Sequence, residues 1–256
     1  MCGIAGIVGT ASPDVILRMT QILKHRGPDD IGTKCFPTHA AALGHTRLSI
    51  IDLSPLGHQP MVDASGHLWI TFNGEIYNFQ EIRETLIGLG HSFRSHSDTE
   101  VLLAAYAQWG RDCLHRLNGM FAFAIFDERD GSLFLARDRL GIKPLYYAQT
   151  PSGLLFASEI KSLFASGMVQ PEPDYVALAT PAMFQVAPLT GFEGVRKLPP
   201  GHSLTFKNGH LHIAPYWQVT PTETLSDLNT AAEQLDHLLQ DSIRLQMIAD
   251  VPVGLL

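Results

Sequence analysis

The sequence predicts an α+β protein with largely antiparallel sheet and helices in separate layers. Runs of strand candidates are grouped apart from pairs of helix candidates, without the regular strand-helix alternation of a parallel sheet. Residues 120–156 read as strand, turn and strand around Asp130-Gly131, which is typical of an antiparallel meander. Asn208-Gly209 separates another pair of strand candidates in the same way. These observations disfavour a doubly wound parallel sheet.

The earlier strand candidates are short apolar or alternating segments. They lie at 3–8, 40–53 and 67–72. The last of these is expected to stop at Asn73-Gly74, because this dipeptide favours a turn. Residues 168–202 hold many of the prolines and are expected to be irregular.

Helices are predicted where apolar residues recur at a spacing of three to four. Their expected starts are Ser12, Asn78, Ser97 and Leu228. The first helix has Pro13 in its first turn and ends before Gly27-Pro28. In the second, Asn78 and Glu81 match a capping box and Gly90 ends the helix.

Composition divides the chain and limits its partners. We assign a main domain to residues 1–215, a linker to 216–225 and the start of a further domain to 226–256. Of 256 residues, 45% are hydrophobic and 17% charged, which is typical of a globular protein. The net charge of −7, without a basic stripe, disfavours nucleic acid and anionic membranes as partners.

Neither targeting segments nor metal sites are expected. The start of the chain lacks the basic residues of a signal peptide, and no apolar run reaches the roughly 20 residues of a membrane helix. Cys2, Cys35 and Cys113 have unrelated spacings, which indicate neither a disulfide framework nor a zinc site. Cys35 and Cys113 are expected to be inert buried thiols. We expect no metal, and a reducing, cytoplasmic compartment.

Cys2 is the strongest candidate nucleophile. A small second residue favours removal of Met1, which would leave Cys2 with a free α-amine. That amine has a pKa of about 8 and can take the proton of the thiol directly or through water. The alternative is a buried thiol in an edge strand, and Cys2 by itself does not decide between them.

An ordered set of motifs accompanies Cys2 and resembles the class II glutamine amidotransferases. The set consists of Met1-Cys2-Gly3-Ile4-Ala5-Gly6, His25-Arg26-Gly27-Pro28-Asp29, His45-Thr46-Arg47-Leu48-Ser49-Ile50, Asn73-Gly74-Glu75-Ile76-Tyr77-Asn78 and Ser97-Asp98-Thr99-Glu100. Later motifs are similar to glutamine-dependent asparagine synthetases: Gly119-Met120-Phe121-Ala122-Phe123, 137–147, Ala157-Ser158-Glu159-Ile160-Lys161, 197–202 and Asp250-Val251-Pro252-Val253-Gly254. We assign a structural role to the Arg26 to Asp29 and Arg137-Asp138 pairs.

The resemblance implies a fold and a reaction. The fold is a four-layer sandwich of two stacked antiparallel sheets between helical layers, as in N-terminal-nucleophile hydrolases. In the reaction, Cys2 attacks the side-chain amide of glutamine, forms a glutamyl thioester and releases ammonia. Asn73 and Gly74 would stabilise the oxyanion. For these two residues the alternative is an ordinary Asn-Gly turn.

The same resemblance implies a pocket for glutamine. Arg47 would bind the α-carboxylate, and Glu75 and Asp98 the α-ammonium. Leu48, Ser49, Ile50 and Ile51 are expected to line this pocket together with Asn73 and Gly74. The alternatives are a surface ion pair for the charged residues, and a helix cap for Asp98.

Residues 226–256 resemble the severed start of an asparagine-synthetase-like ATP-binding domain. The cofactors of that domain, ATP and Mg²⁺, are expected there and none in this chain. The expected ammonia acceptor is aspartate or a related carboxylate, with Thr180-Pro181-Ala182-Met183 departing from the family pattern near the domain junction. A homodimer is left open. Two alternatives stand beside this function: a catalytically dormant domain that stabilises a synthetase partner, and another class II amidotransferase that acts on a sugar phosphate or phosphoribosyl acceptor.

Overall fold

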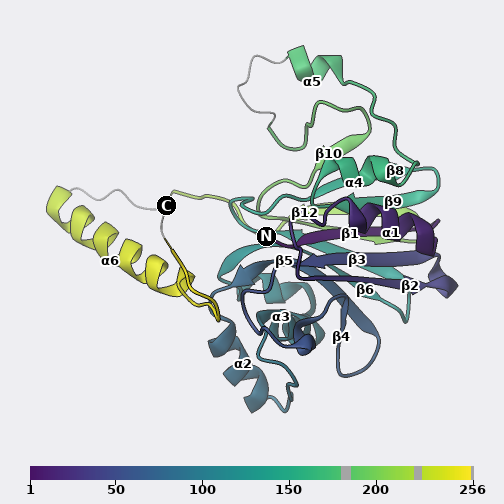
Figure 1. Cartoon of the computed structure of the whole chain (residues 1–256). Coiled ribbons are helices and arrows are strands. Elements are labelled where there is room, and N and C mark those ends of the chain that lie inside the picture. The colour runs from purple at the N-terminus through teal and green to yellow at the C-terminus, as the bar shows by residue number, and fades with distance from the viewer. Residues whose placement is uncertain (180–185, 222–226, 255–256) are drawn as a thin grey trace.

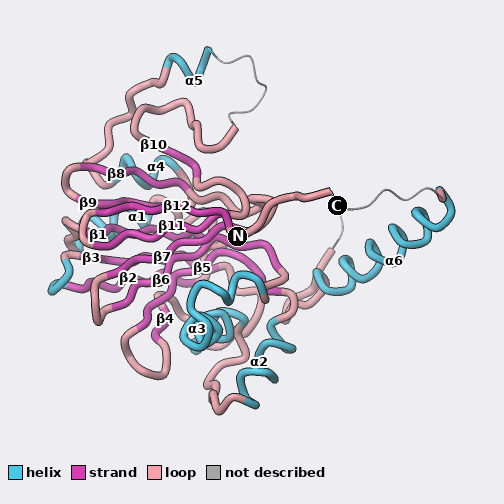
Figure 2. The backbone as a smooth tube through the Cα atoms, turned by 180° about the vertical axis from the view of Figure 1, so that it is seen from behind, coloured by secondary structure: helices cyan, strands magenta, loops and turns pink. Residues whose placement is uncertain are grey.

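Two six-stranded antiparallel sheets stack face to face between helices in the computed structural model (Figure 1). The structure describes residues 1–179, 186–221 and 227–254. Seen from behind, the two layers of strands run through the body of the molecule, with α3 packed below them and α6 projecting from one side (Figure 2). This arrangement confirms the predicted four-layer sandwich.

The first sheet contains the N-terminal strand near its centre. Its strands, in spatial order, are β10 (Val195–Lys197), β8 (Tyr146–Thr150), β9 (Gly153–Ala157), β1 (Gly3–Val8), β3 (Ala41–Arg47) and β2 (Asp30–Phe36). Every residue of β1 is buried. A Cβ atom on Gly6 would lie only 2.2 Å from the Phe156 ring, so this position requires glycine. The sheet thereby holds residue 2 at the end of a fully covered strand.

The second sheet carries the Asn73-Gly74 dipeptide. Its strands, in spatial order, are β12 (His210–Pro215), β11 (His202–Lys207), β7 (Ser132–Arg137), β6 (Gly119–Asp127), β5 (Leu68–Ile76) and β4 (Met61–Val62). The Asn208-Gly209 turn joins β11 to β12 as predicted, with positive φ at both residues. Asp130-Gly131 likewise joins β6 to β7.

The helices form the outer layers and one projecting arm. They are α1 (Pro13–Gln21), α2 (Phe79–Gly88), α3 (Asp98–Trp109), α4 (Ile160–Ala165), α5 (Tyr175–Ala179) and α6 (Leu228–Gln246). α1 and α4 cover the first sheet, whereas α3 covers the second and α2 packs on α3. Ser12 and Ser97 cap α1 and α3 by accepting a backbone N–H each.

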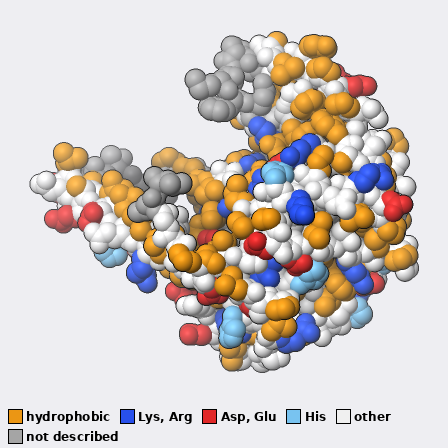
Figure 3. All heavy atoms as spheres, viewed as in Figure 1, with side chains coloured by type: hydrophobic (Ala, Val, Ile, Leu, Met, Phe, Trp, Pro, Cys, Tyr) orange, Lys and Arg blue, Asp and Glu red, His pale blue; other side chains and the backbone are white. Residues whose placement is uncertain are grey.

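Three hydrophobic cores hold the four layers together. Ile4, Leu43 and Phe126 belong to the core between the sheets, Ile16 and Leu163 to the core under α1 and α4, and the core under α2 and α3 is built on the other face of the second sheet. In contrast, α6 has no buried residue, and its apolar side chains are exposed on the projecting arm (Figure 3). Within the described ranges, no helix has the length and apolar character needed to cross a membrane.

Two predicted strand boundaries were wrong. β5 does not stop at Asn73-Gly74 but continues to Ile76, because β6 pairs with it along its whole length. The predicted extended segment over 40–53 ends at Arg47, and residues 48–53 form a loop in which Asp52 has a φ of 55°. Both differences create part of the candidate site.

Three smaller predictions also need correction. The strands over 120–156 do not form one meander, since β6 and β7 lie in the second sheet and β8 and β9 in the first. The side chain of Asn78 does not cap α2 but bonds the backbone of Arg116 and Asn118. The irregular segment 168–202 contains α5 and β10. Residues 180–183, which were predicted to depart from the family pattern, lie outside the described residues.

Candidate active site

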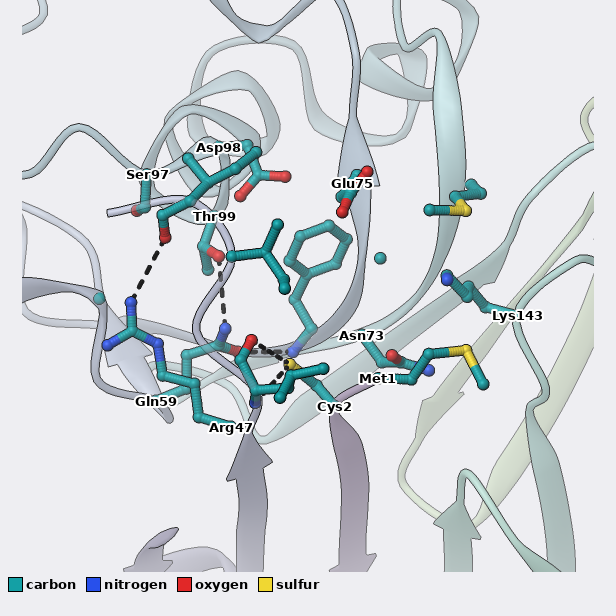
Figure 4. Close-up of a pocket in the computed structure, with 17 residues that line it drawn as sticks. Met1, Cys2, Arg47, Gln59, Asn73, Glu75, Ser97, Asp98, Thr99 and Lys143 are labelled. Atoms are coloured by element: carbon teal, nitrogen blue, oxygen red, sulfur yellow. Dashed lines mark hydrogen bonds between the residues drawn. The ribbon is translucent and has the colours of Figure 1, made fainter. Parts of the chain in front are cut away.

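A cavity of about 210 Å³ opens where the ends of β1 and β3 meet β5 and the first turn of α3. Its walls combine backbone and side chains from both sheets, and the close-up in Figure 4 shows Asp98 and Glu75 on one side and Cys2 and Asn73 on the other. The lining residues are Met1, Cys2, Arg47, Leu48, Ile50, Ile51, Gly57, Gln59, Phe72, Asn73, Gly74, Glu75, Ser97, Asp98, Thr99, Met120 and Lys143. The size suits a ligand no larger than an amino acid.

The Cys2 thiol lies in this cavity because β1 is paired on both sides. Cys2 precedes Gly3, which pairs with Thr46 of β3. The backbone N–H of Leu48 donates to Sγ at 3.4 Å, and Arg26 Nε donates to the carbonyl of Cys2 at 2.9 Å. Burial raises the pKa of the thiol despite the Leu48 hydrogen bond. A neutral thiol of this kind needs a base before it can act as a nucleophile.

Met1 precedes Cys2 and lines the same cavity. The free α-amine therefore belongs to Met1, and the nitrogen of Cys2 is part of a peptide bond. Burial lowers the pKa of the Met1 amine. The base predicted from the sequence becomes available only when Met1 has been removed.

Asn73 presents an unused hydrogen-bond donor. Its side chain is only 1% exposed, and its Nδ2 has no hydrogen-bond partner among the described residues. Buried polar atoms without partners are rare, and an unpartnered donor is suited to a charge that develops during a reaction. The neighbouring Gly74 packs so closely on β6 that an added Cβ would lie 2.3 Å from the Met120 carbonyl.

The Arg47 guanidinium is held by neutral groups. NH1 donates to the Ser54 carbonyl at 3.0 Å, and NH2 donates to the carbonyls of Ile51 and Asp52. These bonds use three of its five N–H groups, and no carboxylate of the described residues forms an ion pair with it. Its positive charge is therefore fixed in place and remains available to an anionic ligand. An added Cβ on Gly57 would overlap NH2, so a larger residue there would displace the guanidinium.

The loop that holds Arg47 is itself tied to the C-terminal segment. Asp250 accepts a hydrogen bond from the Asp52 N–H at 2.7 Å and donates its own N–H to the Ile50 carbonyl at 2.9 Å. The Asp52 carboxylate accepts bonds from Ser54 and from the His96 N–H. These contacts stabilise the left-handed conformation of Asp52.

Two carboxylates face the guanidinium across the cavity. Asp98 is 5% exposed and its Oδ2 accepts the Ile76 N–H at 3.0 Å. Burial raises the pKa of Asp98 to about 7, and the charge of Glu75 adds to this effect. Burial also raises the pKa of Glu75 and lowers that of Lys143. A cationic ligand group between Asp98 and Glu75 would favour their ionised forms.

The structure brings together all but one of the predicted site residues. Ser49 is the exception: it does not line the cavity, and its N–H donates to Asp29 Oδ2 at 2.8 Å. Gly57, Gln59, Thr99, Met120 and Lys143 line the cavity but were not selected from the sequence. Three of them, Thr99, Met120 and Lys143, lie in motifs that carried the family resemblance, which was the available signal.

Residues with predicted structural roles bond mainly to backbone. Arg137 donates to three carbonyls, and Asp138 accepts backbone N–H groups that include those of Phe121 and Lys143. Cys113 is buried, and burial raises its pKa to about 12. Cys35 is only partly buried, contrary to prediction, because it lies in β2 at the edge of its sheet. The described residues contain no cluster of metal ligands.

The chain is similar to proteins of known families. A family model described as a glutamine amidotransferase domain matches residues 1–217. The glutamine-hydrolysing asparagine synthetase 3 of Bacillus subtilis is 38% identical over 265 residues, covering 99% of this chain and 42% of that protein. The amidase chry2 of Gibberella zeae is 38% identical over 239 residues, covering 91% of this chain and 35% of that protein.

The fold also matches a solved structure. Glutamine phosphoribosylpyrophosphate amidotransferase of B. subtilis superposes with a TM-score of 0.65 over 85% of this chain and 50% of that chain, at 20% sequence identity. The chain spans about half or less of the length of the curated relatives named above. The chain belongs to the class II glutamine amidotransferase domain family and is related to the corresponding domain of asparagine synthetases.

Proposed function

We propose that this chain hydrolyses glutamine and supplies ammonia to an asparagine-synthetase-like amidation. The observation that carries the proposal is the buried Nδ2 of Asn73, which has no partner among the described residues and lines the same cavity as Cys2. Arg47 on one wall and Asp98 with Glu75 on another give the cavity the charges that complement a free amino acid.

The proposed reaction starts once Met1 has been removed. The freed amine of Cys2 takes the thiol proton, and the sulfur forms a bond to the amide carbon of glutamine. Nδ2 of Asn73 and the backbone N–H of Gly74 stabilise the negative charge on the amide oxygen. The carbon–nitrogen bond then breaks, and the amine returns the proton to the departing nitrogen, which leaves as ammonia. Water cleaves the resulting thioester and yields glutamate.

The binding roles follow from charge. Arg47 would hold the α-carboxylate of glutamine, and Asp98 with Glu75 the α-ammonium, so the side-chain amide is directed toward Cys2. Holding both ends of the ligand converts attack by the thiol into an intramolecular step. Leu48, Ile50 and Ile51 would contact the ligand along its length.

The ammonia acceptor is proposed to be aspartate or a related carboxylate. Similarity to asparagine synthetases favours aspartate, whereas similarity to the amidase chry2 is the reason for including other carboxylates. Activation of the acceptor would use ATP and Mg²⁺ in a synthetase domain that continues from residues 226–256. A cytoplasmic location accords with this chemistry.

A chain that retains Met1 is proposed to be inactive. Met1 acylates the nitrogen that would act as the base and occupies part of the cavity wall. This position of Met1 favours the second candidate function for such a chain, a dormant domain that only stabilises a synthetase partner.

The test is glutamate release from glutamine by three purified forms. Mass spectrometry would first confirm Met1 as absent in one form and retained in another, and the third would be Cys2→Ala. Release by the form without Met1 alone supports the proposal. Equal release by Cys2→Ala, or none by a folded chain without Met1, would contradict it.

A further inference from the structure

Among the described residues, no strand pairs with the outer edge of β5 just before Asn73. β4 consists of Met61–Val62 and pairs only with Ile70 and Trp69. At Phe72, two side chains bond the backbone groups that a neighbouring strand would otherwise bond. The Phe72 N–H donates to Gln59 Oε1 at 2.7 Å, and the Phe72 carbonyl accepts from His45 Nε2 at 3.0 Å. A buried peptide group needs such partners, so side chains here replace a missing strand.

Gln59 also bonds to the opposite wall of the cavity. Its Nε2 donates to Thr99 Oγ1 at 3.3 Å, as the dashed line in Figure 4 shows. Thr99 follows Asp98 in the first turn of α3, and Gln59 and Thr99 are each 4% exposed. One buried amide therefore links the strand that leads into Asn73 with the helix that carries Asp98.

The backbone fixes Gln59 in this position. An added Cβ on Gly32 would lie 2.1 Å from the Gln59 carbonyl, so β2 packs directly against this residue. His45, which bonds the carbonyl of the same Phe72, is 1% exposed, and burial lowers its pKa to about 4. At neutral pH, His45 is uncharged and Nε2 carries the hydrogen that the Phe72 carbonyl accepts.

We propose that Gln59 is a positioning residue that holds Asn73 and Gly74 at a fixed distance from Asp98. The proposal rests on the proposed glutamine hydrolysis, in which these groups act on opposite ends of one ligand. An amino acid held by its α-ammonium reaches the oxyanion donors only when the two walls keep a fixed separation. Misplacement by about 1 Å can cost on the order of 100-fold in rate.

The test compares Gln59→Met with Gln149→Met in the chain without Met1. Methionine keeps the length of glutamine but has no amide, so Phe72 N–H and Thr99 Oγ1 lose their partner. We expect Gln59→Met to lower kcat by roughly 10-fold to 100-fold and to raise KM for glutamine by a smaller factor. The exposed side chain of Gln149 donates to the Gly209 carbonyl, away from the cavity, so the same substitution there should leave both constants unchanged.

Thr99→Val provides a second variant if Gln59→Met does not fold. Valine keeps the shape of threonine and removes the hydroxyl, while the bond between Gln59 and Phe72 stays. We expect the same direction of change with a smaller size, partial rescue in Thr99→Ser, and a double variant less impaired than the product of the single effects. Urea unfolding of each variant separates loss of folded protein from loss of turnover.

The outcomes separate this proposal from the proposed function. Cys2-dependent glutamate release with unchanged kcat and KM in folded Gln59→Met and Thr99→Val would overturn the role of Gln59 alone. A chain without Met1 that neither releases glutamate nor shows a rise in Tm with added L-glutamine would overturn both. Lower stability of Gln59→Met with normal kinetic constants would show a purely structural contact and also count against positioning.

Discussion

Two of the three Asn-Gly dipeptides in the chain have opposite structural roles. Asn208-Gly209 forms the turn between β11 and β12, where φ is 50° at Asn208 and 79° at Gly209. Asn73-Gly74 lies inside β5, paired with Ala122 and Phe121 of β6. The first dipeptide reverses the chain on the surface, whereas the second lies within a strand, where Asn73 is buried and Gly74 is half-buried.

Pairing along a neighbouring strand overrides the local turn preference of Asn73-Gly74. β6 pairs with β5 from Leu68 to Ile76, and a reversal at Gly74 would break the last pairs of this ladder. The small size of Gly74 is used for close approach to Met120 rather than for a left-handed turn. Asn73 then directs an unpaired amide into the cavity, which a turn on the surface would not provide.

The largest expected effect comes from breaking the strand dipeptide. Asn73→Ala removes the proposed oxyanion donor and should lower kcat for glutamine hydrolysis by roughly 100-fold or more. Asn208→Ala is the matched control and should leave kcat unchanged. Steady-state glutamate release measures both, and a similar loss in the two variants would remove the functional distinction between the dipeptides.

A second contrast compares an arginine of the cavity with an arginine on the β6–β7 hairpin. Arg47→Ala should raise KM for glutamine about tenfold or more with a smaller change in kcat, because a charge-assisted bond worth about 1.5–3 kcal/mol is lost. Arg129 forms an exposed ion pair with Asp127 on the β6–β7 hairpin, so Arg129→Ala should not change KM. Equal losses in kcat and in kcat/KM for Arg47→Ala would indicate a transition-state role instead.

The pH dependence of glutamine binding should depend on Asp98 and not on an exposed carboxylate of the β6–β7 hairpin. The pKa of Asp98 is raised to about 7 by burial, whereas hydrogen bonding to Lys207 helps lower that of Asp130 on the hairpin to about 2. As pH falls below about 7, Asp98 takes up a proton and loses its attraction for the substrate ammonium. KM should then rise by up to about tenfold per pH unit. Asp130→Asn should keep this profile.

The same raised pKa predicts an opposite trend in stability. Between the unfolded pKa of about 3.9 and the folded value, the folded chain binds more protons at Asp98 than the unfolded chain does. The contribution of Asp98 to the free energy of unfolding therefore falls as pH rises through this window. Urea unfolding at several pH values should show that Asp98→Asn removes this slope, and an unchanged slope would contradict the raised pKa.

The smallest effect is expected at the turn glycine. Gly209 has open space around its Cα but a φ of 79°, so Gly209→Ala introduces left-handed strain without a clash. It should lower the free energy of unfolding by about 1–2 kcal/mol and leave the kinetic constants unaltered. Urea unfolding and glutamate release on the same sample would check both parts.

Much of this fold could be predicted because local signals and tertiary pairing agree. The caps at Ser12 and Ser97 and the turns at Gly131 and Gly209 act through adjacent backbone, so sequence windows detect them. The four-layer arrangement came from family resemblance, since spacing alone does not specify which strands share a sheet. β6 with β7 and β8 with β9 read alike in sequence but belong to different sheets.

The candidate site was predictable where charge or a motif marked it. Arg47 and Asp98 were selected in this way and both line the cavity. Gln59 was missed because its importance depends on Phe72 and Thr99, which lie 13 and 40 residues away in sequence. Ser49 was selected as a neighbour of cavity residues, but the loop after Arg47 turns it toward Asp29.

The central position of β1 delays its full pairing until late in translation. β1 pairs with β3 and with β9, so its second edge stays open until residue 157 has been synthesised. At about 5–20 residues per second, a ribosome needs roughly 10–30 s to reach that point. An aminopeptidase therefore meets an unpaired N-terminus during translation, before β1 is fixed between β3 and β9. Slow peptidase action would leave a fraction of folded molecules that carry Met1.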